Sequence, residues 1–402
     1  MVVKKRFILI FLFVAVLIFI SALYGNKFYL GSFASMNNDD VKYIRSGIYI
    51  LKKGSLIYKS KNFNTVYIMP GLPFVLAAFF RFFSVLDGVF AFRIFQDILQ
   101  GISAYLIYLL AKEVFDEKVA IVALIIDILY LPEYFVPQVV LNECIFKFLF
   151  LLSIYFAIKG TKTYSFKNYI LSGLAWSLSL YFKPVVALFP IIIALVWIKK
   201  KIDFAFALRV SSAIAVIFIA IMMPWWIRNY NLYDRFIPFT LSSGNPMLQA
   251  TYYNYDNSID FIEYETGDDE IENDKYELYL TRVRFYSQSK KFGWRYVYWY
   301  LIKKTTYLFT RPFYWRDVFG VGLKYVAFVH NFIMLTGILG ILFSRKNILS
   351  DFLLYILIYF VLIYIPYFTF SRYGYPLMPI LIIFSAFLLQ KIFFFDISRN
   401  FK

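Results

Sequence analysis

The chain has 402 residues, of which 61% are hydrophobic and 22% are aromatic. A water-soluble fold cannot bury that much apolar surface, so the composition excludes a soluble domain and predicts a helical membrane protein with several spans. The formal net charge of +17 does not indicate nucleic acid, because the basic residues lie in short clusters between apolar runs, as the positive-inside rule predicts.

The first predicted element is a transmembrane helix over residues 7–23. It follows the basic residues Lys4, Lys5 and Arg6, which place the N-terminus in the cytoplasm. No small-residue cleavage site lies near its end, so we interpret it as a retained span and not as a signal peptide.

Two adjacent carboxylates, Asp39 and Asp40, open the next predicted helix. Asn37 or Asn38 can cap this helix, and the acids then occupy its first turn, where negative charge is favourable. Apolar residues at helical spacing from Tyr43 onward predict an amphipathic helix on the membrane surface. From the local sequence alone, the two acids either only interact favourably with the helix dipole or take part in catalysis.

Lysine-rich loops decide which of the eleven apolar runs cross the membrane. If all eleven crossed, the basic loop 159–167 would lie outside, against the positive-inside rule. The run 72–86 is short, carries Arg81 and follows Pro70, so we predict an interfacial helix on the outer leaflet. The ten remaining runs are the predicted spans: 7–23, 88–111, 118–132, 138–158, 168–182, 184–198, 207–226, 321–343, 351–370 and 374–395.

These spans divide the chain into three parts. Residues 1–226 form a membrane module with a first outer loop at 24–87. Residues 227–320 form a long outer loop, which is long enough for a helical subdomain, and eleven of the 25 acidic residues fall between Asp234 and Glu277 of this loop. Residues 321–402 are the C-terminal transmembrane helices. We therefore expect a multi-pass protein of the cell membrane, with its distinctive polar residues on the periplasmic or extracellular face.

Four stretches carry a resemblance to a known class of enzymes. They read "DDVKY" from Asp39, "YIMPGLPFVLAAFF" from Tyr67, "PWWIRNYNLYDRFIPF" from Pro224 and "SRYGYPLMP" from Ser371. Their order and membrane side are similar to those of GT-C class membrane glycosyltransferases, nearest to the protein O-mannosyltransferase, aminoarabinose transferase and RgtA/B/C/D-like families (glycosyltransferase family 39-like). The resemblance implies an all-α polytopic GT-C fold and an inverting glycosyltransferase that takes its sugar from a polyprenyl-phosphate donor.

The same resemblance implies roles for four polar residues. Asp39 matches the position of a general base, and Asp40 matches either a supporting partner or part of the acceptor site. Tyr43 follows the pair as a substrate-binding residue. In the second outer loop, "LPEYFVPQVVLNE" resembles the place of a second acidic motif, with Glu143 as its candidate; Glu143 could instead simply begin a helix.

A departing lipid phosphate needs cationic partners at the outer membrane boundary. Arg228, Lys183 and Arg372 all fall there in the predicted topology, and we predict that they bind the donor phosphate. The alternative for each is a side chain that snorkels at a helix end. The expected loops lack an Asp-x-Asp or histidine cluster, so we expect no obligatory metal and no other cofactor, while the use of a divalent metal stays open.

Other polar residues lie inside the apolar runs. Arg93 and Asp97 are four residues apart and are predicted to pair on one helix face, Asp127 is a further intramembrane acid, and His330 is predicted to be packed. The expected partners are a polyprenyl-phosphate-linked sugar donor, membrane lipid, and a glycan, lipid or protein acceptor, and no nucleic acid. The alternatives are a polysaccharide polymerase or ligase, and a transporter or flippase for lipid-linked sugars.

Overall fold

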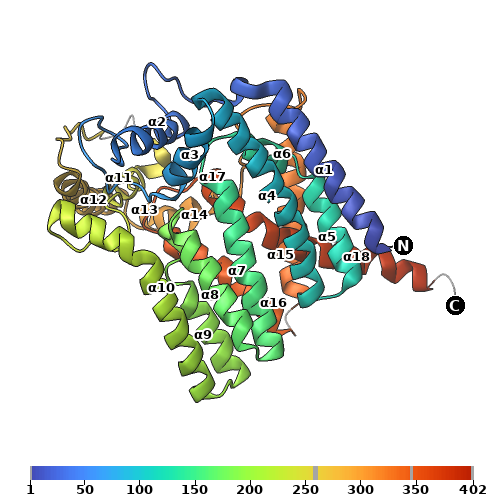
Figure 1. Cartoon of the computed structure of the whole chain (residues 1–402). Helices are drawn as coiled ribbons and strands as arrows, with labels where there is room; N and C mark the ends of the chain where they lie inside the picture. The colour runs from blue at the N-terminus through green and yellow to red at the C-terminus, as the bar shows by residue number, and fades with distance from the viewer. Residues whose placement is uncertain (1, 257–260, 345–346, 400–402) are drawn as a thin grey trace.

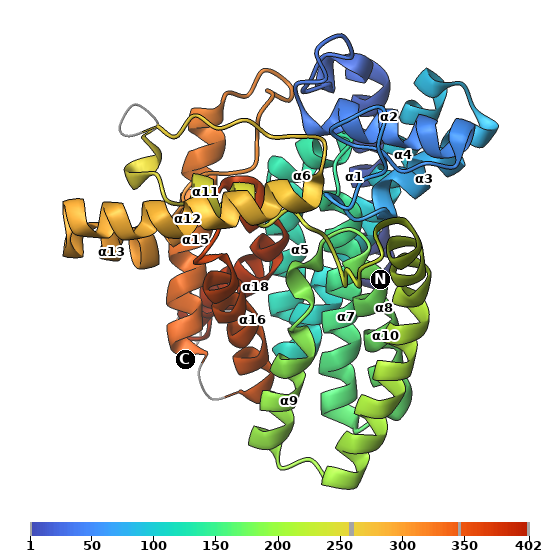
Figure 2. The same cartoon turned by 90° about the vertical axis from the view of Figure 1, so that its left-hand side faces the viewer.

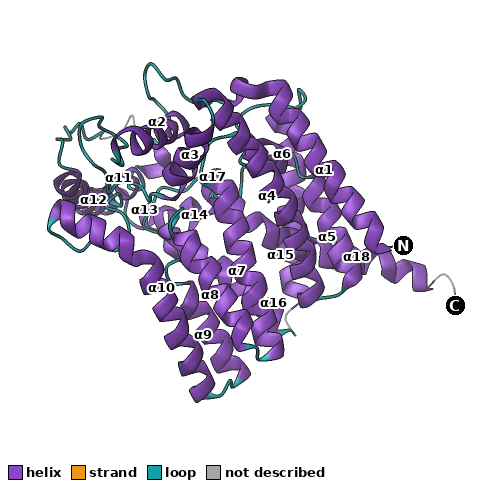
Figure 3. Cartoon of the chain, in the orientation of Figure 1, coloured by secondary structure: helices purple, strands orange, loops and turns teal. Residues whose placement is uncertain are grey.

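The computed structural model describes residues 2–256, 261–344 and 347–399. Within these ranges it consists of helices and loops and contains no β-strand (Figure 3). The apolar runs form helices because hydrocarbon offers no partner to an unpaired backbone group, and a helix satisfies these groups internally. The predicted all-α polytopic class is confirmed.

Six segments of the described chain are long enough and apolar enough to cross a membrane. The long helices among them run side by side in one bundle (Figure 1). The segments are α1 (Val2–Tyr24), α4 (Val85–Val114), α7 (Glu143–Thr163), α10 (Phe204–Tyr233), α15 (Leu323–Phe343) and the stretch Ser371–Ile392, which contains most of α18 (Met378–Arg399).

The other four predicted spans form shorter helices. A proline has no N–H to continue a helix, and Pro132, Pro184 and Pro366 lie just after three of these helices. Each of the ten predicted ranges thus overlaps one of these ten helices of the described chain. Six of the segments have the length of a full span, or seven if the pair Glu117–Leu129 and Pro132–Gln138, bent by 60°, counts as one. The shorter helices are α5 (Glu117–Leu129), α8 (Phe166–Leu180), α9 (Phe189–Lys200) and α16 (Ile348–Tyr364).

Two short helices lie at one end of the bundle (Figure 1). The helix α2 (Asp39–Lys53) packs against α3 (Gly71–Phe82), and α3 also contacts α4. The close packing depends on Gly47 of α2, where a Cβ atom would lie 2.9 Å from the Cβ of Leu76. The run predicted as an interfacial helix is therefore α3 followed by a break at Phe83–Ser84.

The segment after α10 folds at the same end of the molecule as α2. Its longest helix, α12, lies across the ends of the bundle helices, whereas the turn between α9 and α10 lies at the opposite end (Figure 2). Tyr296, Trp299 and Tyr300 pack together with Ala250 as a small separate core. The helices of this segment are α11 (Gly244–Gln249), α12 (Glu270–Phe292), α13 (Trp294–Tyr298) and α14 (Lys304–Thr306), joined in part by η4 (Tyr253–Tyr255) and η5 (Trp299–Lys303).

The short connecting helices at this end matter for the site. They break the path of the chain where polar side chains meet, and all of them except η1 begin or end close to a proline. They are η1 (Gly25–Phe28), α6 (Pro132–Phe135), η2 (Val136–Gln138), η3 (Pro184–Val186), α17 (Ser371–Gly374) and η6 (Tyr375–Leu377).

Candidate active site

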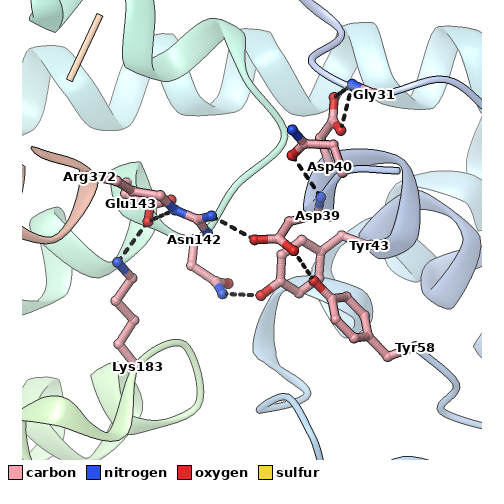
Figure 4. A network of polar contacts seen from close by, with 10 residues as sticks. Gly31, Asp39, Asp40, Tyr43, Tyr58, Asn142, Glu143, Lys183 and Arg372 are labelled. Carbon is pink, nitrogen blue, oxygen red and sulfur yellow. Dashed lines mark hydrogen bonds and ion pairs between the residues drawn. The ribbon is translucent and has the colours of Figure 1, made fainter. Parts of the chain in front are cut away.

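The two adjacent carboxylates at the start of α2 point in different directions (Figure 4). The side chain of Asn38 caps the helix by accepting a hydrogen bond from the backbone N–H of Asp39, as the sequence predicts. Asp40 is fully buried, and its carboxylate accepts hydrogen bonds from the backbone N–H groups of Leu30 and Gly31, at 2.7 and 3.1 Å. Asp40 thus holds the loop before α2 in place.

This placement corrects the prediction that Asp40 belongs to the catalytic pair. Its oxygens are engaged by backbone donors, and it does not line the cavity that Asp39 borders. Successive residues of a helix project about 100° apart, and Asp39 and Asp40 accordingly point in different directions. In the structure, the carboxylate of Asp40 therefore contacts the loop before α2 and not the cavity.

Asp39 begins a chain of four charged side chains of alternating sign (Figure 4). Its Oδ2 lies 2.7 Å from Nη1 of Arg372. Nε of Arg372 donates to Oε1 of Glu143, and the same oxygen accepts from Nζ of Lys183 at 2.7 Å. The formal charges of the four groups sum to zero, and three of the side chains are at most 12% exposed, whereas that of Asp39 is 40% exposed.

Helix boundaries bring these four residues together from distant parts of the chain. Asp39 begins α2 and Glu143 begins α7, which starts five residues later than the predicted span because η2 occupies residues 136–138. Lys183 lies between α8 and η3, and Arg372 lies in α17 just before the last long helix. Three of the predicted site residues besides Asp39 are therefore neighbours in the structure.

Two opposing effects determine the pKa of Asp39. Burial raises the pKa of this carboxyl, but the Arg372 guanidinium and the hydrogen bond from Tyr58 lower it further, so that the pKa lies below its usual range. Burial lowers the pKa of Lys183 below that of a free lysine, although Glu143 acts in the opposite direction. The ion pair with Arg372 and the hydrogen bond from Tyr58 therefore hold Asp39 as a carboxylate at neutral pH.

Tyrosines surround the carboxylate of Asp39. The hydroxyl of Tyr58 donates to Oδ1 of Asp39 at 2.6 Å, so both oxygens of this carboxylate have a partner. The hydroxyl of Tyr43 accepts from Nδ2 of Asn142 at 2.8 Å. Burial raises the pKa of both tyrosines, which keeps their hydroxyls protonated. Tyr43, predicted as a substrate-binding residue, borders the same cavity as Asp39.

The cavity beside these residues has a volume of about 470 Å³. Its walls come from α2, from the loop after α2, from the turn between α8 and α9, from the segment 239–246 and from the end of α16. Its charged lining residues are Asp39, Lys183 and Arg372, its polar lining includes Thr240, Ser242 and Ser243, and its apolar lining includes Val185, Ala187, Leu188 and Ile363.

Arg228, which was predicted to bind the donor phosphate as Lys183 and Arg372 were, lies outside this group. Its Nη1 donates to the carbonyl oxygen of Thr65 at 2.9 Å and to Oδ1 of Asn229, and the guanidinium lies over the Trp225 ring. It does not line the cavity. The Arg228 side chain thus reaches the outer loop and bonds to its backbone.

The intramembrane pair Arg93 and Asp97 also differs from the prediction. The two side chains are not bonded to each other: Nε of Arg93 donates to the carbonyl oxygen of Gln138, and Asp97 accepts from Ser21 and from Nε2 of Gln138. Both side chains therefore bond to Gln138 and fix the position of η2, the short helix before α7. His330 is buried and bonded to Tyr130 and to the Phe309 carbonyl, which confirms the prediction that it is packed.

The sequence prediction missed a second ionic group one turn below the site. Nζ of Lys147 bonds to Oε2 of Glu133 and lies 2.8 Å from the Tyr375 hydroxyl, which donates to the same Glu133 oxygen at 2.9 Å. Lys147 and Glu133 are completely buried. A lysine inside the apolar run of α7 was the available signal, because an unpaired ammonium is costly there.

The site was also searched for side chains that could together bind a metal ion. Among the residues that the structure describes, no group of three or more His, Cys, Asp or Glu side chains is arranged to hold a metal ion.

Comparisons with known proteins agree with the sequence motifs. Residues 69–227 match the family model of dolichyl-phosphate-mannose-protein mannosyltransferases, a stretch that includes Glu143 and Lys183. No curated protein matches the chain.

Solved structures resemble the whole chain at low sequence identity. The oligosaccharyltransferase AglB from Archaeoglobus fulgidus, in complex with an inhibitory peptide and a dolichol-phosphate, is 14% identical with a TM-score of 0.57, and the match covers 98% of this chain and 52% of that one. A second structure of the A. fulgidus oligosaccharyltransferase, tethered with an acceptor peptide, is 12% identical with a TM-score of 0.54, covering 96% and 49%. ArnT from Cupriavidus metallidurans is 13% identical with a TM-score of 0.45, covering 97% and 78%.

The chain spans about half the length of the oligosaccharyltransferases that it matches. The match nevertheless covers nearly all of this chain, so the two proteins share the membrane fold. Together with the mannosyltransferase model over residues 69–227, this confirms the resemblance that the motifs indicated. The chain is a multi-pass membrane protein with the GT-C glycosyltransferase fold.

Proposed function

We propose that this protein transfers a sugar from a polyprenyl-phosphate donor to a hydroxyl group of an acceptor. The observation that carries the proposal is the convergence of one partly exposed carboxylate, Asp39, with two buried cations, Arg372 and Lys183, at one cavity. Transfer from a lipid phosphate needs a base for the acceptor proton and positive charge for the leaving group, and these side chains can supply both.

Asp39 is the base in this mechanism. The acceptor hydroxyl loses its proton to the carboxylate while its oxygen attacks the anomeric carbon, and the bond from that carbon to the phosphate oxygen breaks. A single displacement of this kind inverts the configuration at the anomeric carbon. Tyr58 orients the carboxylate through its bond to Oδ1, which leaves Oδ2 as the oxygen that Arg372 now occupies.

The donor phosphate and Asp39 compete for the same guanidinium. Nη1 of Arg372 bonds to Asp39, while its Nε is held by the buried Glu143. A phosphate that takes over the outer side of the guanidinium frees Oδ2 of Asp39 and weakens the electrostatic effect that lowers its pKa, which makes it a better base. Donor binding thereby prepares the base for the acceptor.

Arg372 and Lys183 neutralise the charge that develops on the phosphate as it leaves. Glu143 positions both cations through one oxygen and does not touch the substrate in this mechanism. Since two fixed cations provide the charge, we propose that a divalent metal is not obligatory, and transfer should continue in the presence of a chelator. The acceptor is a glycan, a lipid or a protein.

The active site lies on the periplasmic or extracellular face in this proposal. The support comes from the position of the lysine-rich turn between α9 and α10, which the positive-inside rule places in the cytoplasm. That turn lies at the end of the bundle opposite to α2 (Figure 2). A water-accessible label at the α9–α10 turn should therefore react only from the cytoplasmic side.

A transfer assay with purified protein tests the function. Radiolabelled polyprenyl-phosphate sugars are incubated with the protein and a membrane extract as acceptor, with the Asp39→Asn protein as the control. We expect label to move from the lipid to a second product with the unchanged protein only, with or without EDTA. Equal transfer by both proteins would rule out Asp39 as the base, and no transfer from any donor, together with no binding of polyprenyl phosphate, would refute the function.

A further inference from the structure

A short segment leads from the end of α16 to the arginine of the site. Residues 365–370 join α16 to α17, which carries Arg372, and they do not form a helix. Tyr367 of this segment lines the cavity, so one side of the segment borders the site. The buried backbone groups of a non-helical segment need partners outside it. The residues that supply those partners therefore help to determine where Arg372 lies.

The amino group of Lys304 binds two carbonyl groups of the 365–370 segment. Its Nζ lies 2.5 Å from the carbonyl oxygen of Ile365 and 3.0 Å from that of Tyr367. Lys304 is completely buried, and within the described chain it forms no ion pair with a carboxylate. Lysines are almost never fully buried unless they are paired. Here both partners of the amino group belong to the segment that precedes Arg372.

The attachment runs in both directions. The hydroxyl of Thr369 donates to the carbonyl oxygen of Lys304 at 2.6 Å. The backbone N–H of Thr369 donates to the hydroxyl of Tyr255 at 2.9 Å, and the two hydroxyl oxygens lie 2.7 Å apart. Thr369 is buried, so water does not compete for these bonds. Three hydrogen bonds thus join Lys304 to the segment, two through its side chain and one through its backbone.

The same outer loop supplies further partners. The N–H of Phe368 donates to the carbonyl oxygen of Pro246 at 2.8 Å, and the hydroxyl of Tyr300 donates to that of Pro366 at 3.1 Å. The Tyr300 ring also lies beside the amino group of Lys304, with 3.8 Å between Nζ and the ring centre. The long outer loop 227–320 therefore binds consecutive residues of the 365–370 segment.

A close contact fixes the chain on the other side of Arg372. At Gly374 a Cβ atom would overlap the carbonyl oxygen of Leu308, so a glycine is needed where α17 lies against this residue. The short stretch 304–308 thus contacts the chain both before and after Arg372. Lys304 itself does not line the cavity. Any effect of Lys304 on a ligand must therefore pass through the segment that it holds.

The hydrogen bonds of Lys304 do not depend on its charge. Burial lowers the pKa of Lys304 to about 7. The ammonium form has three N–H donors and the neutral amine has two, so either form can bond to both carbonyl oxygens. We therefore expect this attachment to persist on both sides of neutral pH.

We propose that Lys304 is a positioning residue for the donor phosphate: it holds the 365–370 segment in the place where Arg372 can bind that phosphate. The proposal rests on the proposed function and extends it to a residue of the outer loop that does not touch the substrate. Without the N–H donors of Lys304, two buried carbonyl oxygens would lack a partner, and the segment would shift to regain one. Arg372 would then move away from the position that suits the phosphate.

The first experiment removes the amino group and keeps the length of the side chain. Affinity for polyprenyl phosphate is measured for the unchanged protein, Lys304→Met and Lys304→Gln. We expect a loss of about fivefold in Lys304→Met and a smaller loss in Lys304→Gln, whose amide keeps N–H donors. Lys303→Met is the matched control: Lys303 is exposed, so this variant should bind the lipid phosphate like the unchanged protein.

The second experiment tests whether Lys304 acts through Arg372. Affinity for polyprenyl phosphate is measured for Lys304→Met, for Arg372→Lys and for the double variant. If Lys304 only positions Arg372, its loss should matter little once the guanidinium is gone, so the double variant should bind within about twofold of Arg372→Lys. Independent effects would instead multiply, which would place the double variant about 50-fold below the unchanged protein.

A further pair of variants tests the attachment if Lys304→Met does not fold. Thr369→Val removes the hydroxyl that donates to the carbonyl oxygen of Lys304, whereas Thr369→Ser keeps it. We expect Thr369→Val to bind polyprenyl phosphate about threefold more weakly, and Thr369→Ser to bind it like the unchanged protein. Unchanged affinity in Thr369→Val would overturn the proposal.

The outcomes separate this inference from the function itself. Unchanged affinity in a folded Lys304→Met protein, multiplied losses in the double variant, or an equal loss in Lys303→Met would each overturn the inference and leave the glycosyltransferase intact. A lower melting temperature of Lys304→Met without a loss of affinity would also overturn it, since Lys304 would then serve stability alone. Failure of the unchanged protein both to bind polyprenyl phosphate and to turn over any donor would refute the proposed function, and this inference with it.

Discussion

Two ionic groups join the start of α7 to the segment before the last long helix, and they differ in what they face. Glu143 bonds to Arg372 beside the cavity, and one turn further along α7, Lys147 bonds to Glu133 and Tyr375 in the closed interior. Glu143 and Lys147, four residues apart on α7, thus contact Arg372 and Tyr375, three residues apart in the segment 371–377. The first group borders a cavity through Asp39, and the second is completely buried.

This difference separates a group that can exchange partners from one that cannot. Arg372 lines the cavity, and in the proposed mechanism a phosphate replaces Asp39 there, so the outer group takes part in the reaction. Lys147 and Glu133 are both completely buried, so a ligand in the cavity does not reach them. Removal of either partner would leave the other charge buried and unpaired. The inner group fixes the register of α7 against residues 371–377, and through it the positions of Glu143 and Arg372.

The largest expected effect comes from the two adjacent acids. Asp39→Asn keeps the shape of the side chain but removes the proton acceptor, so turnover should fall roughly 100- to 10,000-fold while the melting temperature in detergent changes little. Asp40→Asn should do the reverse, because an amide that faces the N–H groups of Leu30 and Gly31 loses acceptor strength at a buried position. Activity per folded molecule and melting temperature are measured on both. Full specific activity in a well-folded Asp39→Asn protein would end the catalytic assignment.

The next effect concerns the inner group. Lys147→Met should lower the free energy of unfolding by about 3–5 kcal/mol, because it leaves Glu133 charged, buried and unpaired. The double variant Glu133→Gln with Lys147→Met removes both charges and should recover a large part of that loss. Unfolding measured in a denaturing detergent series decides between them. A double variant less stable than Lys147→Met would show that the pair does not act as a unit.

Sequence motifs singled out the four residues of the ionic group at the cavity, but they did not predict the contacts of Arg228. Asp39, Glu143, Lys183 and Arg372 lie at helix ends, where short motifs mark the residue. Arg228 also lies near a helix end, but its long side chain bonds to the carbonyl oxygen of Thr65 in a distant loop, and no local pattern predicts that partner.

The inner group and the helix lengths were harder to predict for a different reason. Lys147 is visible in an apolar run, but its partners Glu133 and Tyr375 are set by how α6 and η6 are turned. Hydropathy likewise placed ten helices, whereas four of them are shorter than a full span because prolines and local turns end them early. Tertiary packing determines both features.

A smaller effect separates the arginine at the cavity from the one at the loop. Arg372→Lys keeps a charge but loses the planar fork that reaches Glu143 and Asp39 together, so affinity for polyprenyl phosphate should fall by about tenfold. Arg228→Lys is the matched control and should leave this affinity unchanged, because Arg228 lies outside the cavity. Direct binding to labelled lipid phosphate measures both. Equal losses in the two variants would place Arg228 in the phosphate site after all.

The smallest effect is a pH dependence that Lys183 gives to donor binding. Burial lowers its pKa, so the ammonium loses its proton at a lower pH than a free lysine, and the positive charge available to the phosphate declines as pH rises. A sugar-bearing donor is a phosphodiester with one constant negative charge, so its affinity should fall a few-fold between neutral and alkaline pH for reasons that lie in the protein. In Lys183→Arg the guanidinium stays charged, and the same titration should become flat. Asp39 does not contribute to this change, because its pKa lies below its usual acidic range and it is a carboxylate throughout. A decline of equal size in Lys183→Arg would assign the titration to another group and leave Arg372 as the cation that binds the phosphate.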